Sequence, residues 1–401
     1  MIRILKHIVK IILIFMLIMC WGRALGYANN IENERKTLNF YFEDSNKNME
    51  LVKSINEYDS ELAVTGWLEK SSQVVVNPDL EKSADKLDIL IIKGLSNLII
   101  RGSMLFSDDL EGCLIDEDTS YKLFGSSNCV GREIKYNDRK LIVRGILKGS
   151  KANMMVQAAK DSTEALYGLT IDGTDFTLNK IEDFKFKFGI EEMDISGSIY
   201  YKISKFIAMI FPIIALTLIL IKSKNKPIVC AIYVFMIFSV LFIFFKVTDI
   251  KISIPLDMIP NKWSNFEFWS KMGKEYKEKF EYVMYMKKYG IDVYNIENLL
   301  KSVLYSIFTI ILFIVNLKLI KISNIKELII VNGISIICTF IVVLMVWYKY
   351  KFDININMIW IIYPLYLCGD YFMKIHEKYL IYEENLSEEN KSDYMFKKTV
   401  C

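Results

Sequence analysis

Five uninterrupted apolar runs constrain this chain more than any other feature of its sequence. They cover residues 203–221, 228–245, 303–320, 328–347 and 358–373. The hydrocarbon core of a bilayer is about 30 Å thick, and a helix of about 20 apolar residues crosses it. In lipid a helix satisfies its own backbone hydrogen bonds, so it is the structure that such a run adopts. The runs therefore predict a bundle of membrane-spanning helices.

A sixth, shorter apolar run at residues 11–21 follows the basic residues Arg3, Lys6 and Lys10. This pattern is typical of a signal peptide, and an uncleaved anchor has it too. Small residues at 22–28 offer a place for cleavage, whereas bulky Met19 makes Cys20 a poor lipoprotein site. We favour the anchor, which brings the expected number of transmembrane helices to about six.

The composition sets limits on partners. Hydrophobic residues make up 53% of the chain, and the formal net charge is only +3. No cluster of lysine and arginine is interleaved with aromatic residues, as a nucleic-acid surface would require. Nucleic acid is therefore not expected as a partner, and the lipid bilayer is.

The short loops predict the orientation, because loops rich in lysine and arginine stay in the cytoplasm. Residues 222–226 and 318–326 are both rich in lysine, and the N-terminus is also basic. The expected product is a multi-pass protein of the cell membrane with its large polar segment outside. The expected divisions are an anchor or signal segment at 1–26, an extracytoplasmic domain at 27–202, a helix pair at 203–246, an outer segment at 247–301, three transmembrane helices at 302–373 and a cytoplasmic tail at 374–401.

The fold class predicted for the outer domain, inserted after the first helix, is α+β. Short β-type runs occur at residues 61–67, 73–76, 87–93 and 112–115, and a helix at 117–124 is stopped by Gly125. Asn137 and Asp138 tolerate the left-handed backbone of a tight turn, so they predict a hairpin between flanking strands.

The outer segment at 247–301 contains an expected amphipathic helix at 264–289. Ser264 and Glu267 form a capping box, and Trp263 can pack against Phe268 one turn later. Gly290 would stop this helix. Its apolar positions are spaced three and four residues apart, so one face is apolar. That face would either pack on the outer domain or lie at the outer membrane surface.

The residues that carry most enzyme chemistry are missing from the outer domain. His7 and His376 are the only histidines and lie near cytoplasmic ends of apolar runs, so neither a Ser-His-Asp triad nor a histidine metal site is expected outside. No phosphate-binding Gly-x-x-x-x-Gly-Lys-Ser/Thr loop occurs. We therefore expect no catalytic, cofactor or metal site, and no enzyme activity. The acidic residues at 108–118 are expected to be solvated loop charges and a helix N-terminus rather than a calcium loop.

Cys113 and Cys129 are the two cysteines that lie together in a polar region. The predicted topology places them in an oxidising compartment, where a disulfide could form. A disulfide that closes a loop of this size contributes about 3 kcal/mol.

Four short motifs follow one another at residues 112–117 (Gly-Cys-Leu-Ile-Asp-Glu), 121–125 (Tyr-Lys-Leu-Phe-Gly), 130–134 (Val-Gly-Arg-Glu-Ile) and 141–147 (Leu-Ile-Val-Arg-Gly-Ile-Leu). As an ordered set they resemble the core of the extracytoplasmic domain in MacB/FtsX-type ABC transporter permeases, where a strand, a helix ending in Leu-Phe-Gly, a Gly-Lys/Arg turn and a hairpin ending in Val-x-Gly-Ile/Val follow in this order. The motif positions are Asp116, Leu123, Phe124, Gly125, Gly131 and Gly145.

The resemblance implies a permease-like subunit whose outer domain moves when a separate cytoplasmic ATPase cycles. It also implies a homo- or hetero-dimer with another permease subunit. The chain departs from the family in having six apolar runs instead of four spans, and residues 222–227 are too few for the family's cytoplasmic coupling helix. The alternative is a membrane-anchored binding or scaffold protein that keeps this outer domain without ATP-driven motion.

Overall fold

The computed structural model describes residues 2–31, 37–42, 47–174, 176, 178–191, 194–196, 198–222, 227–248, 266–285, 289–350 and 362–375. The chain divides into two compact units. The helical unit comprises residues 1–29, 204–250 and 301–401, and the sheet unit comprises residues 30–203 and 251–300.

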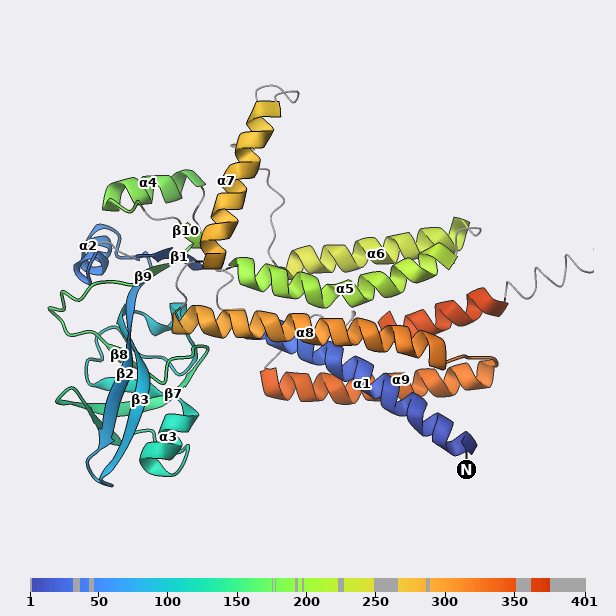
Figure 1. The fold of residues 1–401 in the computed structure, drawn as a ribbon, viewed down its shortest axis with the longest axis horizontal. Helices are drawn as coiled ribbons and strands as arrows, with labels where there is room; N and C mark the ends of the chain where they lie inside the picture. The colour runs from blue at the N-terminus through green and yellow to red at the C-terminus, as the bar shows by residue number, and fades with distance from the viewer. Residues whose placement is uncertain are drawn as a thin grey trace, which may run out of the picture. The chain divides into compact units, whose positions relative to one another are not determined.

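The helical unit is built from long apolar helices (Figure 1). Four of the described helices are long and apolar enough to cross a membrane: α1 (Ile2–Asn30), α5 (Ser198–Lys222), α8 (Gly290–Leu319) and α9 (Ile325–Tyr350). The apolar run at 228–245 lies in α6 (Pro227–Thr248), and a further helix covers residues 362–375. The number of six transmembrane helices stays a prediction.

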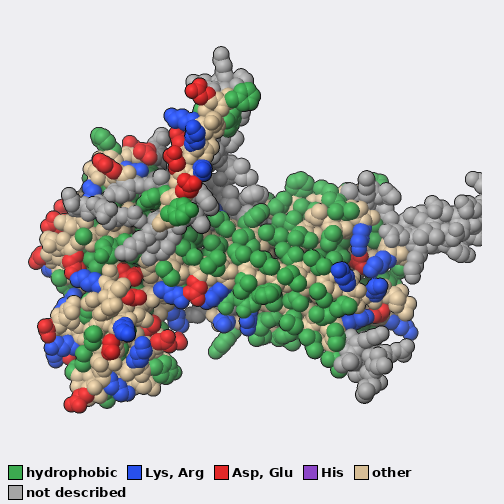
Figure 2. Space-filling view, in the orientation of Figure 1, with side chains coloured by type: hydrophobic (Ala, Val, Ile, Leu, Met, Phe, Trp, Pro, Cys, Tyr) green, Lys and Arg blue, Asp and Glu red, His purple; other side chains and the backbone are tan. Residues whose placement is uncertain are grey.

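The surface of the helical unit has the character that lipid requires. Hydrophobic side chains cover its helices, and basic side chains gather near one set of helix ends (Figure 2). Lys222, Lys321 and Lys374 lie together there, as do Lys10 and Lys326.

The first helix is longer than the apolar run at 11–21 and belongs to the core of the helical unit. Trp21 packs edge-on against Phe211 of α5 at 5.1 Å and donates a hydrogen bond to the carbonyl of Ala208. Ser302 of α8 donates to the carbonyl of Ala24 at 2.9 Å. Hydrogen bonds between membrane helices contribute about 0.6 kcal/mol each. The choice between an anchor and a cleaved signal stays a prediction.

The sheet unit contains a ten-stranded sheet with the strand order β10-β1-β9-β2-β3-β8-β5-β7-β4, and β6 pairs with β2 and β7. Neighbours are antiparallel except for the parallel pairs β3–β8 and β5–β7. The strands are β1 (Thr37–Tyr41), β2 (Val64–Asn77), β3 (Lys82–Gly94), β4 (Arg101–Gly102), β5 (Gly112–Ile115), β6 (Glu133–Tyr136), β7 (Arg139–Lys148), β8 (Met154–Gln157), β9 (Gly168–Asp172) and β10 (Asp194–Ser196).

Both faces of the sheet are covered. In β3, Ile89 and Ile91 point into one core while Leu90 and Ile92 point into the other, as the two-residue period of a strand requires. The helices α2 (Glu50–Tyr58), α3 (Glu117–Phe124) and α4 (Leu178–Phe188) contribute side chains to the first core. The second core contains residues next to the short helix η2 (Ser96–Leu98) and at the start of α8.

The two β-type runs expected at 61–67 and 73–76 are confirmed as strand, but they join into the single strand β2 instead of forming two short strands. The polar pair Ser71 and Ser72 does not make a turn. It lies at a β-bulge, where the register with β3 shifts after Lys70 and Ser72 has a φ of 58°. Pairing with β3 on both sides of the bulge keeps the chain extended.

Candidate functional site

The segments that resemble the permease family lie at residues 112–147 of the sheet unit. We name this part of the unit, which contains β5, α3, β6 and β7, the lobe. The strand at 112–115 and the helix at 117–124 are confirmed as β5 and α3. The carboxylate of Asp116 caps α3 by accepting a hydrogen bond from the amide of Thr119 at 2.8 Å. Leu123 is buried in the first core, and the guanidinium of Arg132 lies over the ring of Phe124 at 5.5 Å.

Three glycines of this lobe have different roles. Gly125 ends α3 with a φ of 71°, and Gly131 turns the chain with a φ of 84° and donates to the carbonyl of Val143. Gly145 instead permits a close approach, because a Cβ there would overlap the side chain of Ser103. Gly145 also lies where the pairing of β5 with β7 shifts register.

The hairpin predicted around Asn137 and Asp138 is confirmed. These residues connect β6 to β7 with φ angles of 44° and 63°, the left-handed conformations of a two-residue turn. Tyr136 faces Arg139 in the register.

Cys113 and Cys129 are buried free thiols in the same core. Burial is the main cause that raises the pKa of Cys113 to about 12, and the neighbouring thiol of Cys129 adds to it. A thiol that holds its proton so firmly is a poor nucleophile. The disulfide between the two residues stays a prediction.

The acidic residues at 108–118 have partners that explain two of them. Asp109 forms a two-pronged ion pair with Arg144, with distances of 2.8 and 3.1 Å, and this contact raises the pKa of the guanidinium. Asp116 caps α3 and accepts a second hydrogen bond from the amide of Asn153 at 3.0 Å. In the described residues, no group of three metal-ligating side chains gathers here or elsewhere.

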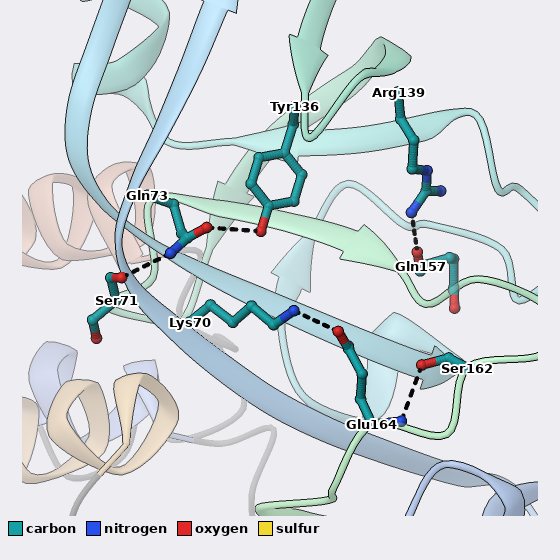
Figure 3. A network of polar contacts seen from close by, with 8 residues as sticks. All are labelled: Lys70, Ser71, Gln73, Tyr136, Arg139, Gln157, Ser162 and Glu164. Atoms are coloured by element: carbon teal, nitrogen blue, oxygen red, sulfur yellow. Dashed lines mark hydrogen bonds and ion pairs between the residues drawn. The ribbon is translucent and has the colours of Figure 1, made fainter.

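A polar network lies around the bulge of β2 (Figure 3). Lys70 pairs with Glu164 at 2.5 Å, and the hydroxyl of Tyr136 donates to Gln73 at 3.3 Å. The side chains of Lys70 and Glu164 are 35% and 41% exposed, so this ion pair contributes little stability. The remaining members are Ser71, Arg139, Gln157 and Ser162, which make hydrogen bonds to or through the backbone. The network holds the bulge against β6 and the loop at 162–164, and it brings no nucleophile and base together.

The start of α8 is anchored on the second core of the sheet unit. We name the residues Tyr289, Gly290, Ile291, Asp292 and Glu297 the α8 anchor. The ring of Tyr289 lies 5.4 Å from that of Trp67 and 5.1 Å from that of Tyr167. Ile291 is buried beside it. Aromatic pairs of this kind add about 0.5–1.5 kcal/mol each beyond their burial.

Polar contacts fix the α8 anchor in register. The carboxylate of Glu69 in β2 accepts the amide hydrogen of Gly290, and the amide of Lys151 donates to the carbonyl of Gly290 at 3.0 Å. The hydroxyl of Tyr41 donates to buried Asp292 at 3.0 Å, and the ammonium of Lys151 pairs with Glu297. Residues 290–300 belong to the sheet unit and residues 301–319 to the helical unit, without a break in the helix.

Sequence reasoning missed the α8 anchor. Gly290 was expected to stop the helix before it, but it is the first residue of α8, and α7 (Phe266–Tyr285) is a separate described helix. Asp292 and Glu297 were placed in the outer segment at 247–301, beyond the helix predicted at 264–289. The signal that could have found the helix is the three-residue spacing of the buried residues Asp292, Asn295 and Asn298.

The predicted helix cap is only partly within the described residues. Trp263 and Ser264 lie outside them, and Glu267 stands in the first turn of α7. Phe266 is 84% exposed and Trp269 is 40% exposed, while Tyr282 packs partly against the second core. The end of α7 therefore packs against the second core of its own unit, and contact of its apolar face with a membrane stays a prediction.

Comparison with known proteins adds two structural matches. The periplasmic region of MacB from Actinobacillus actinomycetemcomitans is 16% identical, with a TM-score of 0.32, and the match covers 40% of this chain and 89% of that one. The extracellular domain of the noncanonic ABC-type transporter YknZ from Gram-positive bacteria is 16% identical, with a TM-score of 0.28, over 39% of this chain and 97% of that one. Scores this low do not establish a shared fold. No protein-family model and no curated protein matches the chain.

Proposed function

We propose that this chain is a permease-like membrane subunit of an ABC-type system, which passes motion or handles substrate through an extracytoplasmic domain. The observation that carries the proposal is the lobe at residues 112–147. Its strand, capped helix, glycine turn and hairpin follow in the order that the resemblance to MacB/FtsX-type permeases implies. Asp116, Gly125, Gly131 and Gly145 each have a structural role that their residue type suits.

The α8 anchor supports α8 as the element that would pass motion from the membrane to the sheet. Aromatic packing, backbone hydrogen bonds and an ion pair join the sheet to the first turns of α8. The same helix continues into an apolar segment long enough to cross a membrane. A displacement of this helix would therefore act directly on β2, the strand that holds Trp67 and Glu69.

A separate cytoplasmic ATPase is the partner that this function requires. The sequence has no phosphate-binding loop of its own, and we assign no catalytic role to the chain. Under the predicted topology the surfaces open to an ATPase are the basic N-terminus, residues 222–226, residues 318–326 and the tail after Met373.

Affinity purification from mild detergent tests this function. The full-length chain should bring down an ATPase under conditions that retain known permease pairs. A chain truncated after Lys378 keeps the last apolar helix and its basic flank, and it should recover less of the ATPase if the tail is the docking surface. Equal recovery would place docking on the basic N-terminus or the lysine-rich loops. No recovery with the full-length chain would contradict the permease function.

One observation favours the alternative of a membrane-anchored binding or scaffold protein. Helix α5 ends at Lys222 and α6 begins at Pro227, which leaves residues 223–226 to connect them. This connection is too short for the coupling helix of the family. If no ATPase is recovered, the scaffold function becomes the better account.

A further inference from the structure

The helical unit contains a cavity of about 450 Å³ between the ends of α5, α8 and the helix at 362–375, lined by both apolar and charged side chains. Its basic lining residues are Lys222 at the end of α5, Lys321 just after α8 and Lys374 near the end of the last described helix. Asp370 is the acidic residue of the lining. Three ammonium groups and one carboxylate leave the cavity positively charged.

Three buried side chains of the lining carry polar atoms without a partner. Tyr363 is 1% exposed, and Tyr366 and Asn316 are each 2% exposed. In the described part of the chain, the hydroxyls of Tyr363 and Tyr366 and the side-chain oxygen of Asn316 have no hydrogen-bond partner. Buried polar groups are almost always paired, and leaving one unpaired costs about 1–3 kcal/mol. A polar ligand in the cavity could satisfy these unpaired groups.

Asp370 holds two of the lysines at the cavity without using up their donors. Its two carboxylate oxygens pair with Lys222 and with Lys374, the latter at 2.6 Å. An ammonium group has three hydrogens, so each lysine keeps donors for another acceptor. The ion pairs with Asp370 therefore hold both ammonium groups at the cavity.

We propose that this cavity binds the phosphate group of an anionic ligand. Ammonium groups and tyrosine hydroxyls all donate to oxygen, and phosphate oxygens accept several charge-assisted hydrogen bonds at once. A cation would be repelled by the lysines, and an apolar guest would leave the hydroxyls unpaired.

The predicted topology places this cavity at the cytoplasmic membrane surface, where anionic lipids supply phosphate. Apolar residues Leu218, Leu317 and Leu367 line the same cavity and suit the first methylene groups of a lipid. The second source is free inorganic phosphate. Neither source depends on the permease function proposed above.

The experiment compares single variants of the full-length chain in mild detergent. Tyr366→Phe removes one unpaired hydroxyl, and Lys321→Gln removes one exposed positive charge. Tyr371→Phe and Lys318→Gln are the matched controls, because Tyr371 lies on the same helix but lines another pocket, and Lys318 is an exposed lysine outside the cavity. Binding of phosphatidylglycerol is measured by native mass spectrometry against phosphatidylcholine, and binding of inorganic phosphate by thermal shift against chloride at equal ionic strength.

We expect phosphatidylglycerol to bind in preference to phosphatidylcholine, and each cavity variant to weaken it about tenfold, as loss of one hydrogen bond to a charged group implies. The two controls should bind as the wild type does. A thermal shift by inorganic phosphate that the cavity variants abolish would identify free phosphate as the source. Equal lipid binding in all five proteins, together with no phosphate effect, would overturn the proposal.

The unliganded protein provides a second readout. Without a phosphate ligand, the hydroxyl of Tyr366 is unpaired, so Tyr366→Phe should leave the melting temperature unchanged or raise it. A lower melting temperature for the ligand-free variant would mean that the hydroxyl serves the fold, and it would contradict the proposal.

Discussion

The carboxylate of Glu69 in β2 accepts a hydrogen bond from the backbone amide of Gly290, the first residue of α8. The first amide groups of a helix have no partner within it, and a negative charge at this end interacts favourably with the helix dipole. Glu69 therefore caps α8 from a strand that lies far away in the sequence. Together with the other contacts of the α8 anchor, it connects the sheet to a helix that continues as an apolar segment of membrane-spanning length.

The first prediction concerns the space around Gly290. A Cβ at this position would lie 2.8 Å from the carboxylate of Glu69 and 3.1 Å from the amide of Ala152. Gly290→Ala should therefore destabilise the α8 anchor by about 1–3 kcal/mol, the usual cost of overpacking. Hydrogen exchange at the amides of residues 290–293 should become faster.

Gly273→Ala in α7 is the matched control. A Cβ there meets nothing within 4 Å, so alanine should stabilise the helix by about 1 kcal/mol. If Gly290→Ala is as harmless as Gly273→Ala, the α8 anchor does not hold the helix in the way described.

The second prediction concerns Gly145 in the lobe. Gly145→Ala would overlap both side-chain atoms of Ser103, so it should lower the free energy of unfolding of the sheet unit by about 1–3 kcal/mol. Ser103→Gly should restore stability in the double variant, while Ser103→Ala should not, because its Cβ remains. Equal behaviour of the two double variants in thermal unfolding would rule out this contact as the reason for glycine.

The third prediction concerns Cys113 and Cys129. Non-reducing mass spectrometry of protein from membranes should find their peptides linked, and free thiols at both positions would exclude the disulfide. In the reduced, folded protein, burial raises the pKa of Cys113 from 9.0 to about 12, so alkylation at pH 8 should require denaturant.

The same shift gives the reduced protein a pH dependence with a definite sign. The folded thiol keeps its proton at a pH where the unfolded thiol loses it, so this group stabilises the fold fully below pH 9.0. Its contribution is lost as the pH rises from 9.0 toward about 12. Comparison with Cys113→Ala separates this loss from the titration of lysines and tyrosines.

The fourth prediction concerns topology. In a cysteine-free background, single cysteines at Lys224 and Asn324 should resist an impermeant thiol reagent in whole cells, because lysine-rich loops stay in the cytoplasm. A cysteine at Asn137 should react. Labelling at Lys224 would show that the predicted orientation is wrong. The proposed ATPase surfaces depend on that orientation.

Local signals in the sequence were sufficient for the lobe. Asp116, Gly125 and the pair Asn137 and Asp138 act within a few residues of where they stand, as a helix cap, a helix stop and a turn. Residue type alone therefore predicts β5, α3 and the hairpin.

Long-range contacts explain what the sequence could not predict. The β-type runs at 61–67 and 73–76 looked separate in the sequence, but pairing with β3 joins them through a bulge into one long strand. Gly290 looks like a helix stop, and only contact with Glu69 makes it a helix start. The residues that line the cavity at the end of α5, such as Asn316 and Tyr366, are scattered between residues 218 and 374, so no local pattern brings them together.

The central claim is that the extracytoplasmic domain moves when a separate ATPase cycles. Spin labels at Asp138, which lies in the exposed hairpin turn, and at Tyr348, which is 85% exposed near the end of α9, test it most directly. The distance distribution between them is measured in membranes that contain the co-purified ATPase, before and after ATP hydrolysis is trapped with vanadate. We predict that trapping shifts the distribution, and that the shift is smaller with Gly290→Ala. Superimposable distributions in the two states would contradict the account.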